Sequence, residues 1–279
     1  MFEGENMRIR RAHPIRDRIK LIFILLLVLG AVANVVQMVN DNRECIKTAT
    51  IDKLIKTALE PVGSTMYIWG GGWNVEDSGS GKNSMQLGLN ETWAEFAKQQ
   101  DADYDYENHR YERENGLDCS GFVGWVLYNT FETQEGKAGY VTTSTDMAES
   151  LAQRGWGKLI KNPKKFLPGD IVSMEGHVWI CLGTCEDGSV LLVHSSPPGV
   201  SVCGTLLPGN AEKSQAEILA TEYMTKQHLN WQEKYPNRKV DAVYLENVVL
   251  FRWSSSVMLD AEELQEKSAE EIMEILRIS

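Results

Sequence analysis

The stretch that decides the fold reads Leu117-Asp118-Cys119-Ser120-Gly121-Phe122-Val123. Within and after it, apolar residues recur three and four positions apart, the spacing of a buried helix face: Phe122, Val123, Val126, Leu127 and Phe131. Asp118 is a favourable N-cap residue, so we expect Cys119 in the first turn of this helix. Unpaired backbone N–H groups and the positive end of the helix dipole favour a thiolate there. The competing interpretation is a small core residue, because free cysteine is among the most buried residue types.

Two β-rich runs further along the chain offer a base for this thiol. Residues 176–183 and 189–194 flank a segment that ends in Asp-Gly, which is a turn signal, and together they predict an antiparallel hairpin. In that hairpin His194 pairs across from about Trp179 and lies diagonal to His177 on the same face. Covalent catalysis by a thiol needs a base beside the nucleophile and a third polar group that holds the base. Cys119, His177 and His194 are therefore the candidate catalytic residues.

Four motifs, in this order along about residues 50–203, resemble those of the NlpC/P60 family of cysteine peptidases. They are Tyr67-Ile68-Trp69-Gly70-Gly71, then Asp118-Cys119-Ser120-Gly121-Phe122-Val123, then Leu167-Pro168-Gly169-Asp170-Ile171-Val172, then Gly176-His177-Val178-Trp179-Ile180-Cys181-Leu182-Gly183 with the later Val193-His194. No single motif is decisive, but the four in sequence form a specific pattern.

The resemblance implies an α+β, papain-like fold, in which an antiparallel sheet packs on helices and the catalytic cysteine lies at a helix N-terminus. It implies cleavage of bacterial cell-wall peptides, typically between D-glutamate and the diamino acid, and it implies no metal or cofactor. Cys119 would be the nucleophile, His177 the base and His194 the residue that orients the base. Three further residues match positions that line the peptide and amine subsites: Tyr67, Asp118 and Ser120.

The sequence departs from the family pattern at two places. The family usually has a small residue after His-Val, whereas this chain has Trp179. An indole on the His177 face would narrow or reshape a subsite, so Trp179 is a further candidate for substrate binding. The second departure is an insertion at residues 74–116, whose part from 102 to 113 is acidic and rich in tyrosine. This insertion is either a wall or lid over the cleft or a solvated excursion.

The N-terminal region carries the signals of a membrane anchor. Residues 1–20 are basic, and residues 21–39 are almost wholly apolar, close to the length of about 20 residues that spans a bilayer. The excess of Lys and Arg before the apolar run places the N-terminus inside and the rest of the chain outside. A secretory signal peptide is the main alternative, since 31–33 reads Ala-Val-Ala, and a buried soluble helix is a third. As a membrane anchor or as a signal peptide, this region would direct the remainder of the chain out of the cytoplasm.

The composition limits the partners of the protein. The chain is 43% hydrophobic with a net charge of −11, so a nucleic-acid partner is not expected. Its five cysteines are Cys45, Cys119, Cys181, Cys185 and Cys203. An odd number outside the cell leaves at least one thiol unpaired. Cys181 and Cys185 form no metal signature, because no second close pair accompanies them.

The remaining periodicity divides the chain into parts. Residues 40–255 form the expected catalytic domain, and residues 256–279 a helical extension. Helices are predicted at 51–59, at 147–154 with Ser144 or Thr145 as cap, and at 210–230. Residues 241–253 are rich in β-formers and could close the sheet. A capping box at 268–271 opens a last amphipathic helix that runs through Leu276.

These features predict a membrane-tethered, extracytoplasmic cysteine endopeptidase that acts on peptidoglycan stem peptides. Two other classes remain open: a wall-binding or secretion-assembly protein with weak or no hydrolysis, and an amidase or acyltransferase on the same scaffold. Tethered wall hydrolases often accompany machines that cross an envelope, so a secretion or conjugation complex is a candidate partner.

Overall fold

The computed structural model describes residues 22, 30, 49–133, 138–209 and 213–278. The chain divides into two units, Met1–Glu44 and Cys45–Ser279, and the fold reported below is that of the second unit. The predicted basic tail and membrane helix, residues 1–39, lie outside the described residues except at Ile22 and Gly30. Within the described ranges, every helix is too short or too polar to cross a bilayer.

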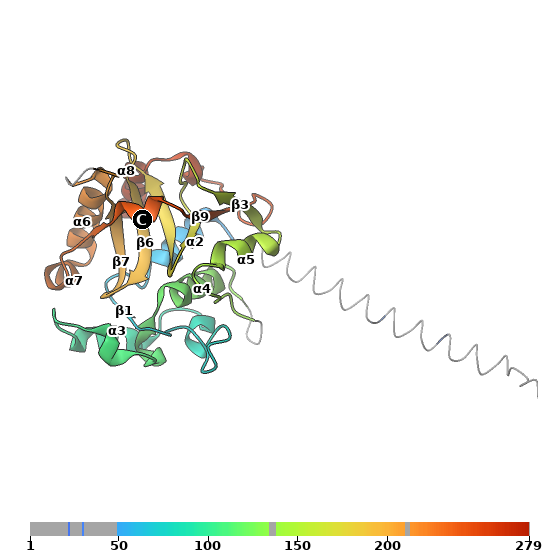
Figure 1. Ribbon diagram of the computed structural model, residues 1–279, viewed down its shortest axis with the longest axis horizontal. Coiled ribbons are helices and arrows are strands. Elements are labelled where there is room, and N and C mark those ends of the chain that lie inside the picture. The colour runs from blue at the N-terminus through green and yellow to red at the C-terminus, as the bar shows by residue number, and fades with distance from the viewer. Residues whose placement is uncertain (1–21, 23–29, 31–48, 134–137, 210–212, 279) are drawn as a thin grey trace, which may run out of the picture. The chain divides into compact units, whose positions relative to one another are not determined.

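The centre of the second unit is a mixed β-sheet of nine strands (Figure 1). The strands are β1 (Met66–Tyr67), β2 (Gly116–Leu117), β3 (Gly157–Lys161), β4 (Ile171–Met174), β5 (His177–Thr184), β6 (Val190–Ser196), β7 (Gly199–Thr205), β8 (Lys239–Val240) and β9 (Val249–Trp253). Their order is β2-β1-β7-β6-β5-β4-β9-β3, and β8 pairs with β7. The β1–β2 and β7–β8 pairs are parallel and the others are antiparallel.

Seven α-helices within the described residues pack on this sheet. They are α2 (Ile51–Leu59), α3 (Glu91–Gln99), α4 (Cys119–Thr130), α5 (Met147–Gln153), α6 (Gln215–Gln227), α7 (Leu229–Lys234) and α8 (Ala269–Ile278). Helix α4 contacts α2, β5 and β6, while α6 contacts β6 and β7. The predicted α+β class is therefore confirmed, and the predicted helix at 51–59 has the observed bounds of α2.

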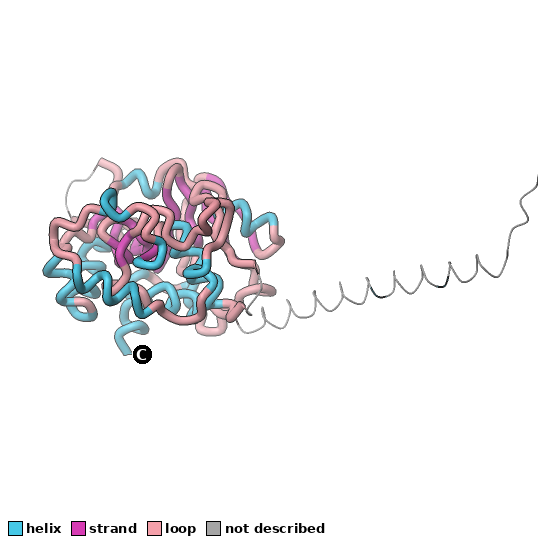
Figure 2. Tube along the Cα trace, turned by 90° about the horizontal axis from the view of Figure 1, so that it is seen from below, coloured by secondary structure: helices cyan, strands magenta, loops and turns pink. Residues whose placement is uncertain are grey.

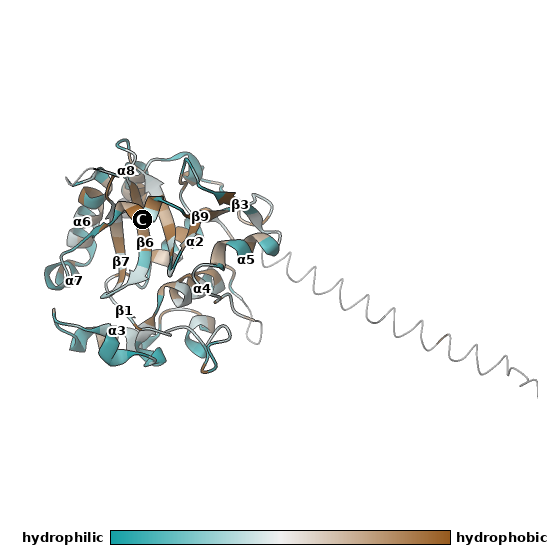
Figure 3. Ribbon diagram, viewed as in Figure 1, coloured by the Kyte–Doolittle hydropathy of each residue, from teal (hydrophilic) through white to brown (hydrophobic). Residues whose placement is uncertain are grey.

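The sheet separates two hydrophobic cores. Along β5, Val178 and Ile180 face the larger core beneath α2 and α4, whereas Trp179 and Cys181 face a smaller core on the other side. This alternation follows from the two-residue period of a strand. Figure 3 shows the hydrophobic residues gathered on the central strands, with α6, α7 and α3 more hydrophilic. Both faces of β5 are buried, which explains its nearly continuous apolar sequence.

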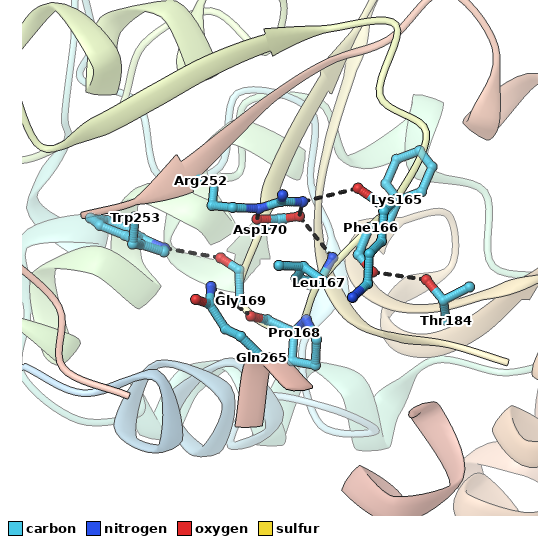
Figure 4. Close-up of polar contacts among 10 residues, drawn as sticks. All are labelled: Lys165, Phe166, Leu167, Pro168, Gly169, Asp170, Thr184, Arg252, Trp253 and Gln265. Carbon is cyan, nitrogen blue, oxygen red and sulfur yellow. Dashed lines mark hydrogen bonds and ion pairs between the residues drawn. The ribbon is translucent and has the colours of Figure 1, made fainter. Parts of the chain in front are cut away.

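The Leu-Pro-Gly-Asp turn is tied to the neighbouring strand β9 by an ion pair whose carboxylate is buried. The Asp170 carboxylate accepts hydrogen bonds from Arg252 Nε at 2.9 Å, from Arg252 Nη2 at 2.6 Å and from the Leu167 N–H at 2.8 Å (Figure 4). Trp253 Nε1 donates to the Gly169 carbonyl at 2.9 Å. These bonds fix the start of β4, and β4 in turn pairs with the strand that carries His177.

The C-terminal helix begins at the predicted capping box. The Ser268 N–H donates to Glu271 Oε2 at 2.7 Å, and the Glu271 N–H donates to Ser268 Oγ at 3.3 Å. Ala269, Ile272 and Met273 of α8 belong to the larger core. Helix α8 therefore packs into the same unit as the sheet.

Three predictions of secondary structure are wrong in detail. Residues 241–253 form a strand only at β9, since Asp241 caps a 3-10 turn, η4 (Ala242–Leu245), through a 2.9 Å bond from the Val243 N–H. The predicted helix at 210–230 is two helices, α6 and α7, which meet at His228. Asp146, not Ser144 or Thr145, occupies the cap position of α5.

Candidate active site

Helix α4 begins where the sequence predicts, and its first residue is Cys119. The Asp118 side chain caps the helix by accepting a hydrogen bond from the Gly121 N–H at 2.7 Å. Such a cap satisfies one of the N–H groups that have no partner in the first turn. Cys119 is buried at 6% exposure in this first turn, so the sulfur lies where the free N–H groups of the helix point.

The Tyr-Ile-Trp-Gly-Gly segment packs directly against this helix start. Strand β1 pairs in parallel with β2, so that Tyr67 lies opposite Leu117. The Asp118 N–H then donates to the Gly71 carbonyl at 3.0 Å. A Cβ atom on Gly121 would lie 2.0 Å from the Gly71 oxygen, so only glycine permits this approach. Two motifs that are about 45 residues apart in the chain therefore form one wall.

Ser120 lies between Asp118 and an aromatic side chain of the insertion region. Its hydroxyl donates to Asp118 Oδ1 at 2.9 Å and accepts from Trp73 Nε1 at 3.0 Å. The Asp118 Oδ2 atom accepts from the Gly70 N–H at 3.2 Å. Burial raises the pKa of Asp118 to about 6, although these donors oppose the shift. Asp118 and Ser120 are thus held in fixed positions beside Cys119.

The predicted hairpin brings the two histidines together. Ile180 pairs with Val193, a register that sets Trp179 opposite His194, as the sequence predicts. His177 Nε2 and His194 Nδ1 lie 2.9 Å apart and share a hydrogen bond. The backbone N–H of Val178, the residue that follows His177, opposes the rise in the pKa of the Cys119 thiol, so this N–H lies near the sulfur.

The resting site holds a thiol and two neutral imidazoles. Burial and the Asp118 charge raise the pKa of Cys119 to about 12, and the N–H groups of Val178 and Ser120 only partly offset them. Burial lowers the pKa of His177 to about 4 and that of His194 well below its usual value. These shifts run against the expected resting thiolate, because desolvation of the sulfur opposes the effect of the helix N-terminus.

A pocket of about 320 Å³ opens at Cys119. Its walls come from the Tyr-Ile-Trp-Gly-Gly segment, the insertion, the start of α4, the loop before α5 and the β4–β5 turn: Tyr67, Trp69, Gly70, Trp73, Asp77, Tyr111, Asp118, Cys119, Ser120, Thr143, Ser144 and Gly176. The charged residues among them are Asp77 and Asp118. Asp77 pairs with Arg113 at 2.7 Å, which leaves Asp118 as the lining carboxylate without an ion-pair partner among the described residues.

The insertion forms part of the pocket wall. Figure 2 views the end of the unit where α3 and β1 lie and shows loops and short helices in front of the strands. Tyr111 of the insertion donates its N–H to the Trp69 carbonyl at 2.8 Å, and Arg113 stacks over the Tyr111 ring at 4.8 Å. Tyr104 donates its hydroxyl to the Tyr67 carbonyl at 2.7 Å. The alternative of a solvated excursion does not fit these contacts.

Trp179 does not line the pocket. Its side chain is fully buried in the smaller core, with ring centroids 5.8 Å from Phe166 and 6.4 Å from Tyr244. The expectation that its indole shapes a subsite is therefore corrected. The residue does share a face with His177, but the ring points into a packed layer that closes over it.

Several residues of the site were not identified from the sequence. Among them, Trp73, Asp77 and Tyr111 line the pocket, and Tyr244 lies beside both histidines. The tyrosine-rich composition of the insertion was the available signal for Tyr111. No local pattern marks Asp77 or Tyr244, because both approach the site from segments distant in sequence.

The other described cysteines, Cys181, Cys185 and Cys203, are free and buried, as Cys119 is. In the described ranges, no group of three or more His, Cys, Asp or Glu side chains is arranged to hold a metal ion. Comparison of the chain with models of known families, with curated proteins and with solved structures found no match. The resemblance to the NlpC/P60 family therefore rests on the four sequence motifs.

Proposed function

We propose that this protein is an NlpC/P60-like cysteine endopeptidase, of papain-like architecture, that hydrolyses an amide bond in peptidoglycan stem peptides. One observation carries the proposal. A cysteine in the first turn of α4 lies near the Val178 N–H of β5, next to His177, and His177 bonds to His194. A cysteine at a helix start, near a hydrogen-bonded histidine pair on adjacent strands, supports acyl transfer by a thiol, in which His177 would serve as the base and His194 as the orienting group.

The proposed reaction starts from the neutral thiol. His177 uses Nε2 to bond His194, so its Nδ1 remains to accept the proton as the Cys119 sulfur attacks the amide carbonyl. His177 then passes this proton to the leaving amine, and a thioester remains on Cys119. Water gives a proton to His177 and attacks the thioester, and the returning proton restores the thiol. The Cys119 backbone N–H supports the oxyanion in both addition steps.

The pocket supports a substrate group that carries positive charge. Asp118 is a buried carboxylate at the pocket wall, and no lysine or arginine lines the cavity. An ammonium group in the pocket would hold Asp118 in its ionised form against the effect of burial. Tyr67, Asp118 and Ser120, which match the family's peptide and amine subsites, all line this cavity. Stem peptides offer such amines, either at a free terminus or on the diamino acid.

The proposed cellular setting follows from the N-terminal sequence. Residues 21–39 would anchor the chain in the membrane, with the catalytic unit outside, or would direct secretion if cleaved. Either setting brings the site to the cell wall. A secretion or conjugation complex that crosses the wall is the partner proposed for an anchored form.

Product analysis tests the proposed reaction. Purified peptidoglycan and isolated muropeptides are digested with the full-length chain, and the fragments are identified by mass spectrometry. The proposal predicts fragments that begin with the diamino acid and complementary fragments that end in D-glutamate. Cleavage between muramic acid and L-alanine would instead indicate an amidase, and a joined product without hydrolysis an acyltransferase. Binding to the wall without any new product would indicate a wall-binding protein.

A further inference from the structure

Tyr244 lies against both histidines of the candidate site. Its ring centroid is 5.4 Å from that of His177 and 5.9 Å from that of His194. The ring planes meet His177 at 59° and His194 at 71°, so the contacts are tilted and edge-on. The centroid of its ring also lies 6.4 Å from that of the buried indole of Trp179. The imidazole pair is therefore in contact with an aromatic side chain from outside its own hairpin.

The segment that delivers Tyr244 is anchored on the sheet. Strand β8 pairs with the end of β7, and the Leu206 N–H donates to the Val240 carbonyl at 2.9 Å. The Asp241 carbonyl then accepts from the Tyr244 N–H at 3.1 Å within the capped turn η4. The side chain of Ser196, at the end of the His194 strand, interacts with the Tyr244 hydroxyl. Both ends of the tyrosine are thus fixed.

The site has a physical need for such a contact. The group that orients His177 is a neutral imidazole, and a hydrogen bond between neutral partners is about half as strong as one to a carboxylate. A single such bond restrains the rotation of the His177 ring weakly. Edge-to-face aromatic contacts have a preferred geometry of their own, so a ring against both imidazoles restrains each of them.

We propose that Tyr244 is a positioning residue that holds His177 and His194 in register with Cys119 and excludes water from the imidazole pair. This inference rests on the proposed peptidase function, whereas the ring contacts of Tyr244 do not depend on the substrate. The ring contacts place Tyr244, His177 and His194 in one cluster.

The charged and titratable neighbours of the two histidines determine how their pKa values would change if the Tyr244 ring were removed. His194 experiences His177 and the buried Arg238, both of which disfavour a charge on it, and Cys119 faces the backbone next to His177. Burial is the cause that lowers the pKa of His177 to about 4. Removal of the phenol admits water, favours the imidazolium and moves this pKa upward toward 6.5.

The test compares Tyr244→Ala, Tyr244→Leu and Tyr244→Phe in the full-length chain. Val243→Ala is the matched control, because Val243 is in the same turn and is 44% exposed. The first readout is titration of His177 by NMR of ¹³C-labelled histidine in the Cys119→Ala background, where no turnover is needed. The chain has five histidines, so single His→Gln variants assign the signals. The second readout is the pH profile of kcat/KM on the muropeptide.

In Tyr244→Ala we expect the His177 titration and the acid limb of kcat/KM to move together to higher pH. At pH 7 we expect kcat/KM to fall about tenfold, or about 1.4 kcal/mol in the barrier. In Tyr244→Phe, both the His177 titration and kcat/KM should match wild type. In Tyr244→Leu, only the titration should match. Val243→Ala should match wild type in both readouts. An unchanged His177 titration in Tyr244→Ala would overturn the inference, and so would a wild-type kcat/KM in Tyr244→Leu. A shifted titration in a chain that hydrolyses no wall peptide would uphold it and reject the peptidase function.

Discussion

Cys119 shows how two local effects compete at one residue. The helix N-terminus contributes roughly 0.3–1 kcal/mol in favour of the thiolate. Burial and Asp118 raise the pKa of the thiol from 9.0 to about 12, which corresponds to roughly 4 kcal/mol against it. Burial therefore dominates, and in the proposed reaction Cys119 is activated by proton transfer to His177 when substrate is present rather than by a resting charge.

This protonation state predicts the alkylation behaviour of Cys119. In the substrate-free protein, the rate of modification by iodoacetamide should be low at pH 7 and should rise continuously to pH 10 and above, because only the thiolate reacts. Peptide mapping by mass spectrometry after timed alkylation measures the rate at each cysteine. A rate that is already at its plateau near pH 7 would show a resting thiolate instead.

At the scale of single residues, the sequence was informative where chemistry is local. The Asp118 cap and the facing of His177 and His194 follow from residue type and strand period, and both are present. The burial of Cys119 and Trp179 and the approach of Tyr244 depend on long-range packing. The local sequence around these three residues does not predict such packing.

At the scale of elements, the Asp170–Arg252 pair joins the turn before β4 to β9. The Asp170 carboxylate is fully buried, and two nitrogens of one guanidinium contact its two oxygens (Figure 4). Breaking a buried pair leaves one charge without a partner, which is costly, whereas an apolar replacement of both partners costs less.

Arg252→Met should lower the free energy of unfolding by about 3–5 kcal/mol, because Asp170 remains buried without its partner. The double variant with Asp170→Leu should recover part of this loss. Urea denaturation of the three proteins gives the free energies for a double-mutant cycle. Arg154→Met is the matched control, since Arg154 stacks on aromatic rings and makes no ion pair with Asp170. Equal losses in the single and double variants would argue against the pair as the cause.

The insertion at 74–116 contributes a strained residue to the pocket. Tyr111 has φ of 64°, a left-handed conformation that is uncommon for tyrosine, and its ring lines the cavity. Strained residues of this kind persist where the surrounding structure holds them, and here the Trp69 carbonyl and Arg113 do so. The insertion therefore sets the shape of one wall.

Tyr111→Asn should raise KM for the wall peptide about five- to thirtyfold with little change in kcat. Asparagine tolerates the left-handed conformation, so the backbone is retained while about 1–2 kcal/mol of ring contact with substrate is lost. Steady-state kinetics on a defined muropeptide measures both constants. Leu87→Ala is the control, since Leu87 is an exposed apolar residue of the same insertion outside the pocket lining. Unaltered KM in Tyr111→Asn would remove the insertion from substrate recognition.

Elements with strong hydrophobic periodicity were predictable from the sequence, whereas segments without it were not. Helix α2 and the β5–β6 hairpin follow their sequence patterns, with apolar faces toward the core. Val243 and Tyr244 are β-forming residues, yet Asp241 caps a turn there, and turn chemistry overrides β-propensity. The arrangement of the insertion could not be foreseen, because its contacts with Trp69 and Tyr67 are set by tertiary structure.

At the scale of the molecule, the C-terminal helix belongs to the fold that carries the site. Helix α8 contacts β5, the strand of His177, and a Cβ atom on Gly183 of that strand would lie 2.8 Å from the Ala269 Cα. Met273 is fully buried in the larger core. Loss of α8 packing should therefore be transmitted to the strand that positions the base.

Met273→Ala should destabilise the unit by about 2–5 kcal/mol, the usual cost of truncating a buried methionine. Thermal unfolding followed by circular dichroism and by tryptophan fluorescence should give one shared transition at a lower temperature than in wild type. Glu274→Ala, on the exposed face of α8, should leave the transition unchanged within about 0.5 kcal/mol. An unaltered transition in Met273→Ala would mean that α8 is an appendage.

The central claim is that hydrolysis of the wall peptide depends on the sulfur at position 119. The most direct measurement is the rate of fragment release from purified peptidoglycan by wild type, by Cys119→Ala and by Cys203→Ala, whose buried thiol lies outside the pocket. We expect wild type and Cys203→Ala to release fragments, and a folded Cys119→Ala protein to release no fragments. Release of the same fragments by Cys119→Ala at the wild-type rate would contradict it.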